Sequence, residues 1–172
     1  MQNLDFDHPS AFWLDLYVNA KLALRVGRFS KNLELAKSIV QSNNIKTPKE
    51  AADYIATNFK YKSDPLWGLI DIQYDLYPFI KNKGGDCEDF ALAVCRLWQA
   101  LGLKSCYVTL VSANIFDNHV MSMCVYDGML YYATPYAFVQ QSFLSVKDVI
   151  KHFETFSNRD YILCDIDDVA NI

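Results

Sequence analysis

The sequence has no long basic run and no uninterrupted apolar run that could cross a membrane. Its formal net charge is -4, from 16 Lys and Arg against 20 Asp and Glu. Proteins that neutralise nucleic-acid phosphates or dock on anionic membranes favour basic patches, so we expect neither nucleic acid nor a membrane as a partner. Charges such as Asp15, Lys21 and Arg25 interrupt the apolar stretches near the N-terminus. This argues against a signal peptide and predicts a cytoplasmic protein.

Closely spaced cysteine pairs are also absent. The five cysteines are an odd number and include no CxxC pair, and no Cys and His residues cluster at metal-ligand spacing. In a reducing cytoplasm we therefore expect mostly free thiols, no zinc site and no cofactor. Residues predicted to fill the core are Cys95, Cys106, Cys124 and Cys164, and those predicted to lie on the surface are His8 and His152.

The sequence is rich in what a packed core needs. Hydrophobic residues make up 52% of the chain and aromatic residues 15%, which is typical of a globular protein and not of a disordered or fibrous one. A chain of 172 residues has the size of one domain. We predict a single domain over residues 1–172, with a helical N-terminal part at 1–50 and a core at 51–172.

Helical patterns occupy the first sixty residues. Apolar residues recur at helical spacing over 9–41, with a separate helix expected inside 30–41. The segment 47–50 reads Thr-Pro-Lys-Glu, which suits an N-cap, a first helical residue and a capping box. A further helix therefore starts there and ends near residue 59.

The middle of the chain changes from irregular to strongly helical. Prolines and glycines interrupt the segment 60–85, where only a short helix near 77–82 is expected. Its many aromatic residues indicate that this segment lines a site rather than being disordered. From Asp86 the apolar residues fall on one helical face until Gly102 ends the helix.

The last third of the chain is dominated by strands. The Asp127-Gly128 pair is typical of a two-residue hairpin turn between two of them. The order of helices, central helix and antiparallel sheet predicts an α+β fold. The expected elements are strands at 105–111, 120–126 and 129–134, a helix at 145–156 and a strand at 161–164.

Cys87 is the first candidate for chemistry, because it lies where the glycine-led segment becomes a helix. The positive end of a helix and its unpaired backbone N–H groups favour a thiolate over a thiol. Gly85 allows a sharp turn, and the N–H of Cys87 could then hold an oxyanion. Taken alone, such a cysteine is more often a small core residue.

His119 supplies a partner for this cysteine. It comes at the head of the predicted strand 120–126, after a polar loop. A histidine at a strand edge can meet the N-terminus of a packed helix and take a proton from a thiol there. The pair therefore predicts Cys87 as nucleophile and His119 as general base.

The segment Gly85-Asp86-Cys87-Glu88-Asp89-Phe90-Ala91 resembles the transglutaminase-like cysteine peptidase superfamily, which has a papain-like fold. The resemblance extends over about 54–135 and includes the approach 59–64, Pro78 and the segment 101–104. It implies a central helix that carries Cys87 and packs on an antiparallel sheet. It also implies that Cys87 is the nucleophile and His119 the base.

The third member of the site departs from the family pattern. Relatives usually have an Asp before Pro or Asn at the end of the strand that pairs with the histidine strand, and this Asp orients the imidazole. The aligned residue here is Thr134, before Pro135. A threonine can accept a hydrogen bond from His119 but carries no charge to stabilise an imidazolium, and loss of an orienting carboxylate can cost roughly 10⁴ in rate.

Two further roles are implied by relatives. Asp86 and Glu88 flank the cysteine, and such residues help to bind calcium in a periplasmic branch of the superfamily, although with Asp89 they also simply complement the helix start. The indole N–H of Trp67 could donate to an oxyanion, whereas a Trp in an aromatic-rich segment more often packs.

Two functions are therefore open. The first is a thiol-dependent hydrolase acting on an amide or peptide bond of a protein or peptide substrate, or a related acyltransferase, with a Cys87–His119–Thr134 site. The second is a catalytically inactive transglutaminase-like module that binds a peptide or protein partner.

Overall fold

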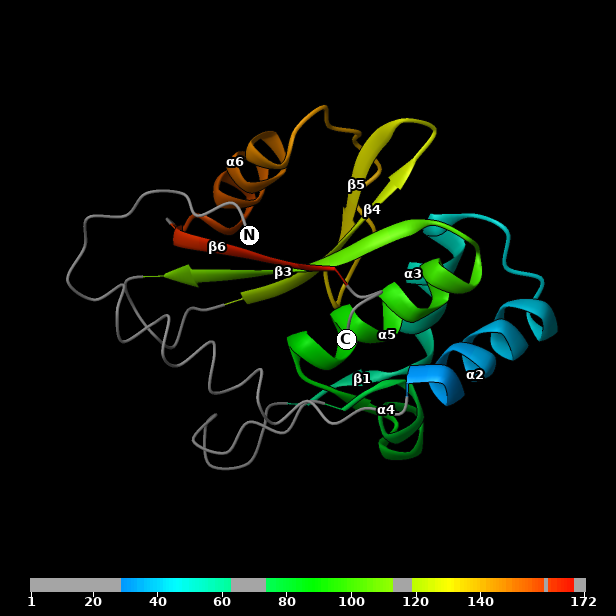
Figure 1. Cartoon of the computed structure of the whole chain (residues 1–172). Helices are drawn as coiled ribbons and strands as arrows, with labels where there is room; N and C mark the ends of the chain where they lie inside the picture. The colour runs from blue at the N-terminus through cyan, green and yellow to red at the C-terminus, as the bar shows by residue number, and fades with distance from the viewer. Residues whose placement is uncertain (1–28, 63–73, 113–118, 160, 169–172) are drawn as a thin grey trace.

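The computed structural model describes residues 29–62, 74–112, 119–159 and 161–168. The predicted helical residues before Phe29, together with His8 and Trp67, lie outside this part of the chain. The fold combines helices with one antiparallel sheet, as the α+β prediction requires (Figure 1).

Four helices gather on one face of the sheet, with the longest apolar one at their centre. The helix α5 (Cys87–Ala100) contacts the three that precede it, which are α2 (Phe29–Ser42), α3 (Pro48–Asn58) and α4 (Leu76–Asn82). The capping box predicted at the start of α3 is confirmed, since Thr47 Oγ1 accepts from the N–H of Glu50 at 3.2 Å and the Glu50 carboxylate accepts from the N–H of Thr47 at 3.1 Å.

The sheet has the strand order β5–β4–β3–β6, and every pairing in it is antiparallel. Its strands are β3 (Lys104–Ser112), β4 (His119–Tyr126), β5 (Met129–Ala133) and β6 (Tyr161–Asp168). The predicted hairpin turn is confirmed, with positive φ angles of 49° at Asp127 and 76° at Gly128. The final strand is longer than predicted, because it pairs with β3 along most of its length.

Two apolar layers cover the two faces of the sheet. On one face, Trp98 and Phe90 of α5 pack in a cluster that includes Tyr107 of β3. On the other face, Phe153 of α6 (Val146–Ser157) packs in a second cluster with Met121 of β4. Figure 1 shows α6 apart from the other helices, across the sheet. Each strand of the sheet centre is therefore buried on both sides.

Two buried polar contacts hold α5 in place. Arg96, which is 1% exposed, makes a two-bond ion pair with Asp75 at the N-cap of α4, with Nε–Oδ1 and Nη2–Oδ2 distances of 3.1 and 3.0 Å. The indole N–H of Trp98 donates to the carbonyl of Pro48 in α3 at 2.9 Å. These bonds connect the central helix to α4 and α3, independently of its packing on the sheet.

Helix α5 and strand β4 begin at the same end of the molecule. An α-helix of 14 residues is roughly 20 Å long, and the part of β3 from Lys104 to Leu110 has about the same length. Because β3 starts just after α5 ends and Leu110 pairs with His119, the chain returns to the start of α5 where β4 begins. This arrangement brings the two candidate segments to one edge of the fold.

Candidate functional site

Cys87 is the first residue of α5, and the residue before it caps the helix. Asp86 Oδ1 accepts from the N–H groups of Glu88 at 3.0 Å and Asp89 at 3.3 Å. Asp89 Oδ2 accepts in return from the N–H of Asp86 at 3.2 Å, which completes a capping box. The prediction that these acids complement the helix start is confirmed for Asp86 and Asp89. Two of the first-turn amides are therefore already used and do not face a substrate.

Glu88 and Asp89 are buried rather than solvated. Glu88 is 7% exposed and Asp89 is fully buried. The carboxylate of Asp89 also accepts from the N–H of Tyr74 at 2.6 Å, so it joins α5 to the chain that enters α4. A charged group with this many N–H donors is stabilised inside the protein without needing an ion.

The two glycines before Cys87 have a steric explanation. A Cβ added to Gly85 would lie 2.0 Å from Asp89 Oδ2, and one added to Gly84 would lie 1.9 Å from the carbonyl oxygen of Lys60. Gly84 also has a φ of +132°. The glycines pair with Lys60–Tyr61 as the short parallel strands β1 (Lys60–Tyr61) and β2 (Gly84–Gly85), which were not predicted. Because they have no side chain, the two glycines allow the main chain to pass close to the buried Asp89 carboxylate just before α5 begins.

The thiol of Cys87 is half-buried, and the residue packs against the apolar cluster between the helices and the sheet. The other cysteines have different surroundings. Burial raises the pKa of Cys95 well above its ordinary value and that of Cys124 to about 12, so both thiols stay protonated and inert. Their predicted core role is confirmed. Cys106 is half-buried, and the side chain of Cys164 lies outside the described part.

His119 is the first residue of β4, and its imidazole stacks on Phe153 of α6, with ring centroids 5.0 Å apart and planes 14° apart. The alternation of β4 places it with Met121, on the face opposite α5. Burial, and to a smaller extent the charge of Arg159, lower the pKa of His119 to about 4. The ring is therefore neutral at physiological pH.

One nitrogen of the His119 imidazole, the buried Nε2, makes no hydrogen bond to the residues that the structure describes. Of the hydrogen bonds described, none joins His119 to Cys87 or to Thr134. In this arrangement the ring and the thiol are at the same end of the fold but on different faces of the sheet.

Thr134 lies just past β5 and uses its hydroxyl locally. Its Oγ1 accepts from the N–H of Tyr136 at 3.3 Å and donates to the carbonyl of Ala137 at 3.4 Å. The backbone N–H of Thr134 donates to the same carbonyl at 2.9 Å. These bonds close a turn around Pro135. The role of Thr134 in orienting His119 stays a prediction.

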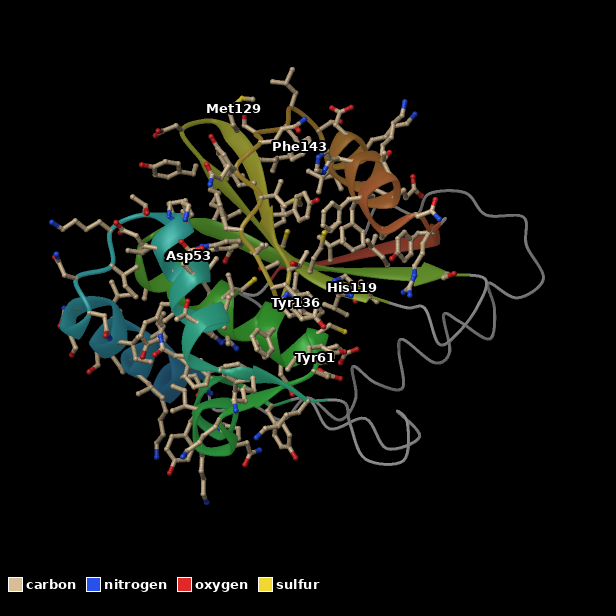
Figure 2. The ribbon with its side chains drawn as sticks, turned by 180° about the vertical axis from the view of Figure 1, so that it is seen from behind. Asp53, Tyr61, His119, Met129, Tyr136 and Phe143 are labelled. Carbon is tan, nitrogen blue, oxygen red and sulfur yellow. The ribbon has the colours of Figure 1, made fainter. Side chains whose placement is uncertain are left out.

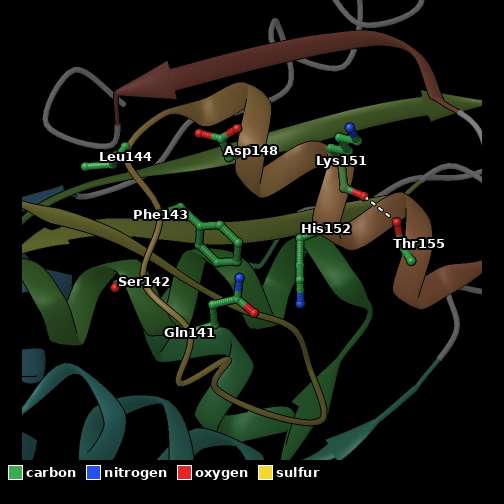
Figure 3. A pocket seen from close by; sticks show the side chains of 8 residues that line it. All are labelled: Gln141, Ser142, Phe143, Leu144, Asp148, Lys151, His152 and Thr155. Carbon is green, nitrogen blue, oxygen red and sulfur yellow. Dashed lines mark hydrogen bonds between the residues drawn. The ribbon is translucent and has the colours of Figure 1, made fainter.

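His152 was predicted to lie on the surface without a partner. It is partly exposed, and its Nδ1 lies 2.9 Å from the hydroxyl of Tyr132, a partner that the sequence did not indicate. The same histidine lines a groove of about 460 Å³ between α6 and the segment 141–144 (Figure 3). Sequence reasoning missed the groove because its walls come from a loop and a helix that show no shared motif.

A calcium site at Asp86 and Glu88, the weaker alternative to their role at the helix start, is not supported. Within the described ranges no group of three or more His, Cys, Asp or Glu side chains could hold a metal ion. Trp67 lies outside the described residues. No helix in the part of the chain that the structure describes is both long and apolar enough to cross a bilayer.

The fold is similar to those of several solved structures. A candidate cysteine protease from Cytophaga hutchinsonii matches with a TM-score of 0.55 and 19% identity, over 86% of this chain and 47% of that one. A TGase matches with a TM-score of 0.50 and 20% identity, over 87% of this chain and 44% of that one. The chain thus spans less than half the length of these two proteins. LapG of Legionella pneumophila, in an EGTA-treated form, matches with a TM-score of 0.47 and 18% identity, over 67% of this chain and 73% of LapG.

Sequence comparison assigns the family. No curated protein matches the sequence. The family model described as the transglutaminase-like superfamily matches residues 34–137, which is more than half of the chain and includes α5, β4 and the turn at Thr134. The predicted papain-like core is confirmed by this match and by the shared fold. The chain belongs to the transglutaminase-like superfamily.

Proposed function

We propose that the protein is a thiol-dependent hydrolase of amide or peptide bonds, with Cys87 as nucleophile and His119 as general base. The observation that carries the proposal is the position of Cys87 as first residue of α5, at the edge where β4 begins with His119. Membership of the superfamily supports it. The protein substrate would approach this edge. A cytoplasmic location suits the four described cysteines, none of which is in a disulfide.

The proposed reaction has two steps. The Cys87 thiol gives its proton to His119, and the thiolate attacks the carbonyl carbon to form a tetrahedral oxyanion. The amine leaves with the proton from His119, and an acyl-enzyme remains. Water, deprotonated by His119, then hydrolyses the thioester and regenerates the thiol. An amine in place of water would give acyl transfer.

The surroundings of Cys87 favour the thiolate in one way and oppose it in another. The N-terminus of α5 stabilises a negative charge on the first residue. The Asp86 carboxylate lies next to it and already takes two of the helix amides. The oxyanion is therefore assigned to the N–H of Cys87 itself, with Trp67 as a candidate second donor.

The proposal requires His119 to move. Its neutral imidazole can accept a proton, but a base whose pKa is about 4 is a weak one. Release of the stack on Phe153 would return the ring to water, raise its pKa and let it turn toward α5. His119 lies at the end of the β3–β4 ladder, where it pairs with Leu110 and has no pairing with β5, so such a turn requires the end of this ladder to open. Thr134 is proposed to accept a hydrogen bond from the displaced ring.

An inactive binding module is the second candidate function. It is favoured by the stack of His119 on Phe153 and by the use of the Thr134 hydroxyl within its own turn. In this alternative the edge beside Cys87 binds a peptide without cleaving it.

The rate of alkylation by iodoacetamide separates the two functions. If Cys87 is activated, its second-order rate at pH 7 exceeds that of an ordinary exposed thiol by about tenfold or more, because a larger fraction is thiolate. The rate is followed by mass spectrometry of the peptide that contains Cys87, with Cys87→Ala as the blank. The buried Cys95 and Cys124 serve as internal slow thiols.

The base is tested in the same assay. His119→Ala should lower the Cys87 rate and shift its pH profile toward that of a simple thiol, whereas His152→Ala, which changes a histidine of the groove, should leave both unchanged. A Cys87 that reacts no faster than a model thiol in the wild-type protein rules out the hydrolase and favours the binding module.

A further inference from the structure

Two tyrosines from distant parts of the chain form an exposed pair beside Cys87. The rings of Tyr61 and Tyr136 have centroids 5.8 Å apart and planes 35° apart. Tyr61 is 42% exposed and Tyr136 is 71% exposed. Single exposed aromatic residues are ordinary on a protein surface, but two that contact each other across separate segments make a continuous apolar patch.

Each tyrosine is tied to one side of the candidate site. Tyr61 pairs with Gly85 in the short parallel sheet, two residues before Cys87, and its ring lies 6.4 Å from that of Phe90, one turn into α5. Phe90 and Cys87 are three residues apart and so share a face of the helix. The aromatic pair is therefore connected, through the buried ring of Phe90, to the helix face that carries Cys87.

Tyr136 approaches from the sheet. It lies two residues after Thr134 and donates its N–H to the Thr134 hydroxyl at 3.3 Å. Figure 2 shows Tyr61, Tyr136 and His119 toward the same end of the molecule. The pair thus bridges β1, which pairs with the glycines that precede α5, and the turn that follows β5, which carries Thr134.

The main-chain segments that carry the two tyrosines are held by hydrogen bonds in the absence of a ligand. The N–H of Lys60 donates to the carbonyl of Lys83 at 3.2 Å, and the N–H of Lys62 donates to that of Gly85 at 2.8 Å. The turn at Thr134 is closed by its own hydrogen bonds. A surface already fixed in this way loses little conformational entropy when a ligand covers it.

We propose that the pair of Tyr61 and Tyr136 is a substrate subsite, which binds an aromatic or bulky apolar side chain of the polypeptide next to the bond that Cys87 attacks. The inference rests on the proposed function, since it places this side chain beside the scissile bond. Two aromatic faces of this size suit a ring or a branched side chain. The exposed Lys60 and Lys62 beside Tyr61 repel Lys and Arg side chains, which favours an uncharged side chain on the pair.

Alkylating agents that differ only in a phenyl group test the subsite. We would compare iodoacetamide with N-phenylalkyl iodoacetamides that carry one to four methylenes between nitrogen and ring, and measure the rate at Cys87. The expected result is a rate ratio, phenyl to plain, that is about five- to tenfold at the best linker length. In the double variant Tyr61→Ser, Tyr136→Ser this ratio should fall to near that of a free thiol.

Matched controls isolate the pair from general effects. Tyr77→Ser removes another exposed tyrosine, 62% exposed on α4, and should leave the ratio unchanged. Tyr61→Phe, Tyr136→Phe keeps both rings and should also keep the ratio. Binding of N-acetyl-phenylalaninamide, against N-acetyl-alaninamide, to the Cys87→Ala variant by ligand NMR gives a readout that needs no reaction.

The outcomes separate this inference from the proposed function. Plain iodoacetamide reports thiol activation alone, and the phenyl-to-plain ratio reports the tyrosine pair alone. A slow plain rate therefore rejects the hydrolase and with it the placement beside a scissile bond, whereas a fast plain rate without a phenyl preference overturns the subsite and leaves the hydrolase standing. The subsite is overturned if no linker gives a preference and N-acetyl-phenylalaninamide does not bind selectively, or if the double serine variant keeps the preference. It is also overturned if the wild-type chain dimerises in sedimentation velocity and the double serine variant does not, since a second copy would then cover the pair.

Discussion

At the scale of single residues, His119 makes the stability of the protein depend on pH. Its pKa is about 4 in the folded state and about 6.5 when unfolded, so between these values the unfolded chain binds more protons. Stability from this group is therefore fully present above about pH 6.5 and is lost as the pH falls toward about 4. The loss at the acid end is on the order of 3 kcal/mol.

His119→Phe removes this titration while keeping an aromatic ring on Phe153. The slope of unfolding free energy against pH between 4.5 and 7 should therefore be smaller in the variant than in the wild-type protein, as measured by urea denaturation. Carboxylates contribute equally to both proteins, so the difference reports His119. Equal slopes would show that the imidazole is not buried in its neutral form.

Gly85 allows a second residue-scale prediction. Gly85→Ala should destabilise the protein by about 2–3 kcal/mol, because the new methyl group would meet the Asp89 carboxylate at 2.0 Å and displace it from its N–H donors. Gly128→Ala is the matched control: nothing lies within 4 Å of its added Cβ, and only the positive φ of 76° is strained. It should cost about 1 kcal/mol. Comparable losses in thermal or urea unfolding would argue against the close packing of Gly85.

At the scale of elements, the ion pair of Arg96 with Asp75 joins the central helix to α4. Arg96→Met should cost about 3–5 kcal/mol, because it leaves the largely buried carboxylate of Asp75 without its charged partner. Asp75→Asn should cost a similar amount, because the amide can still cap α4 but leaves the buried charge of Arg96 without its carboxylate. The double variant should be less unstable than the sum of the two losses in urea unfolding. Additive losses would mean that the two side chains do not interact.

The elements themselves follow closely from local sequence. The capping box at Thr47, the turn at Asp127 and Gly128, and the helix α5 (Cys87–Ala100) depend on interactions between residues a few positions apart. Such interactions can be inferred from the sequence without knowing the tertiary structure. The parallel pairing of β1 with β2 could not be predicted in this way, since Lys60 and Gly84 meet only after α4 has folded back.

At the scale of the whole molecule, the candidate site was predicted in part. The motif around Cys87 identified the helix that carries it, and His119 was correctly placed at the start of a strand at the same end of the fold. The Tyr61 and Tyr136 pair was not foreseen, although Tyr61 lies in the segment that resembles the family. Nothing in a single sequence shows which aromatic rings the fold leaves exposed.

The sequence by itself determined the elements, their caps and turns, and the superfamily, because each depends on neighbouring residues or on a continuous motif. Only the tertiary structure decided on which face of the sheet a side chain lies. The side chain of His119 lies on the face of β4 that α6 covers. Because α5 covers the other face, apolar residues occur on both sides of β4, and its sequence lacks the alternation of polar and apolar residues that would have indicated this face. The same burial makes its imidazole neutral, and it separates the predicted base from the predicted nucleophile in this arrangement.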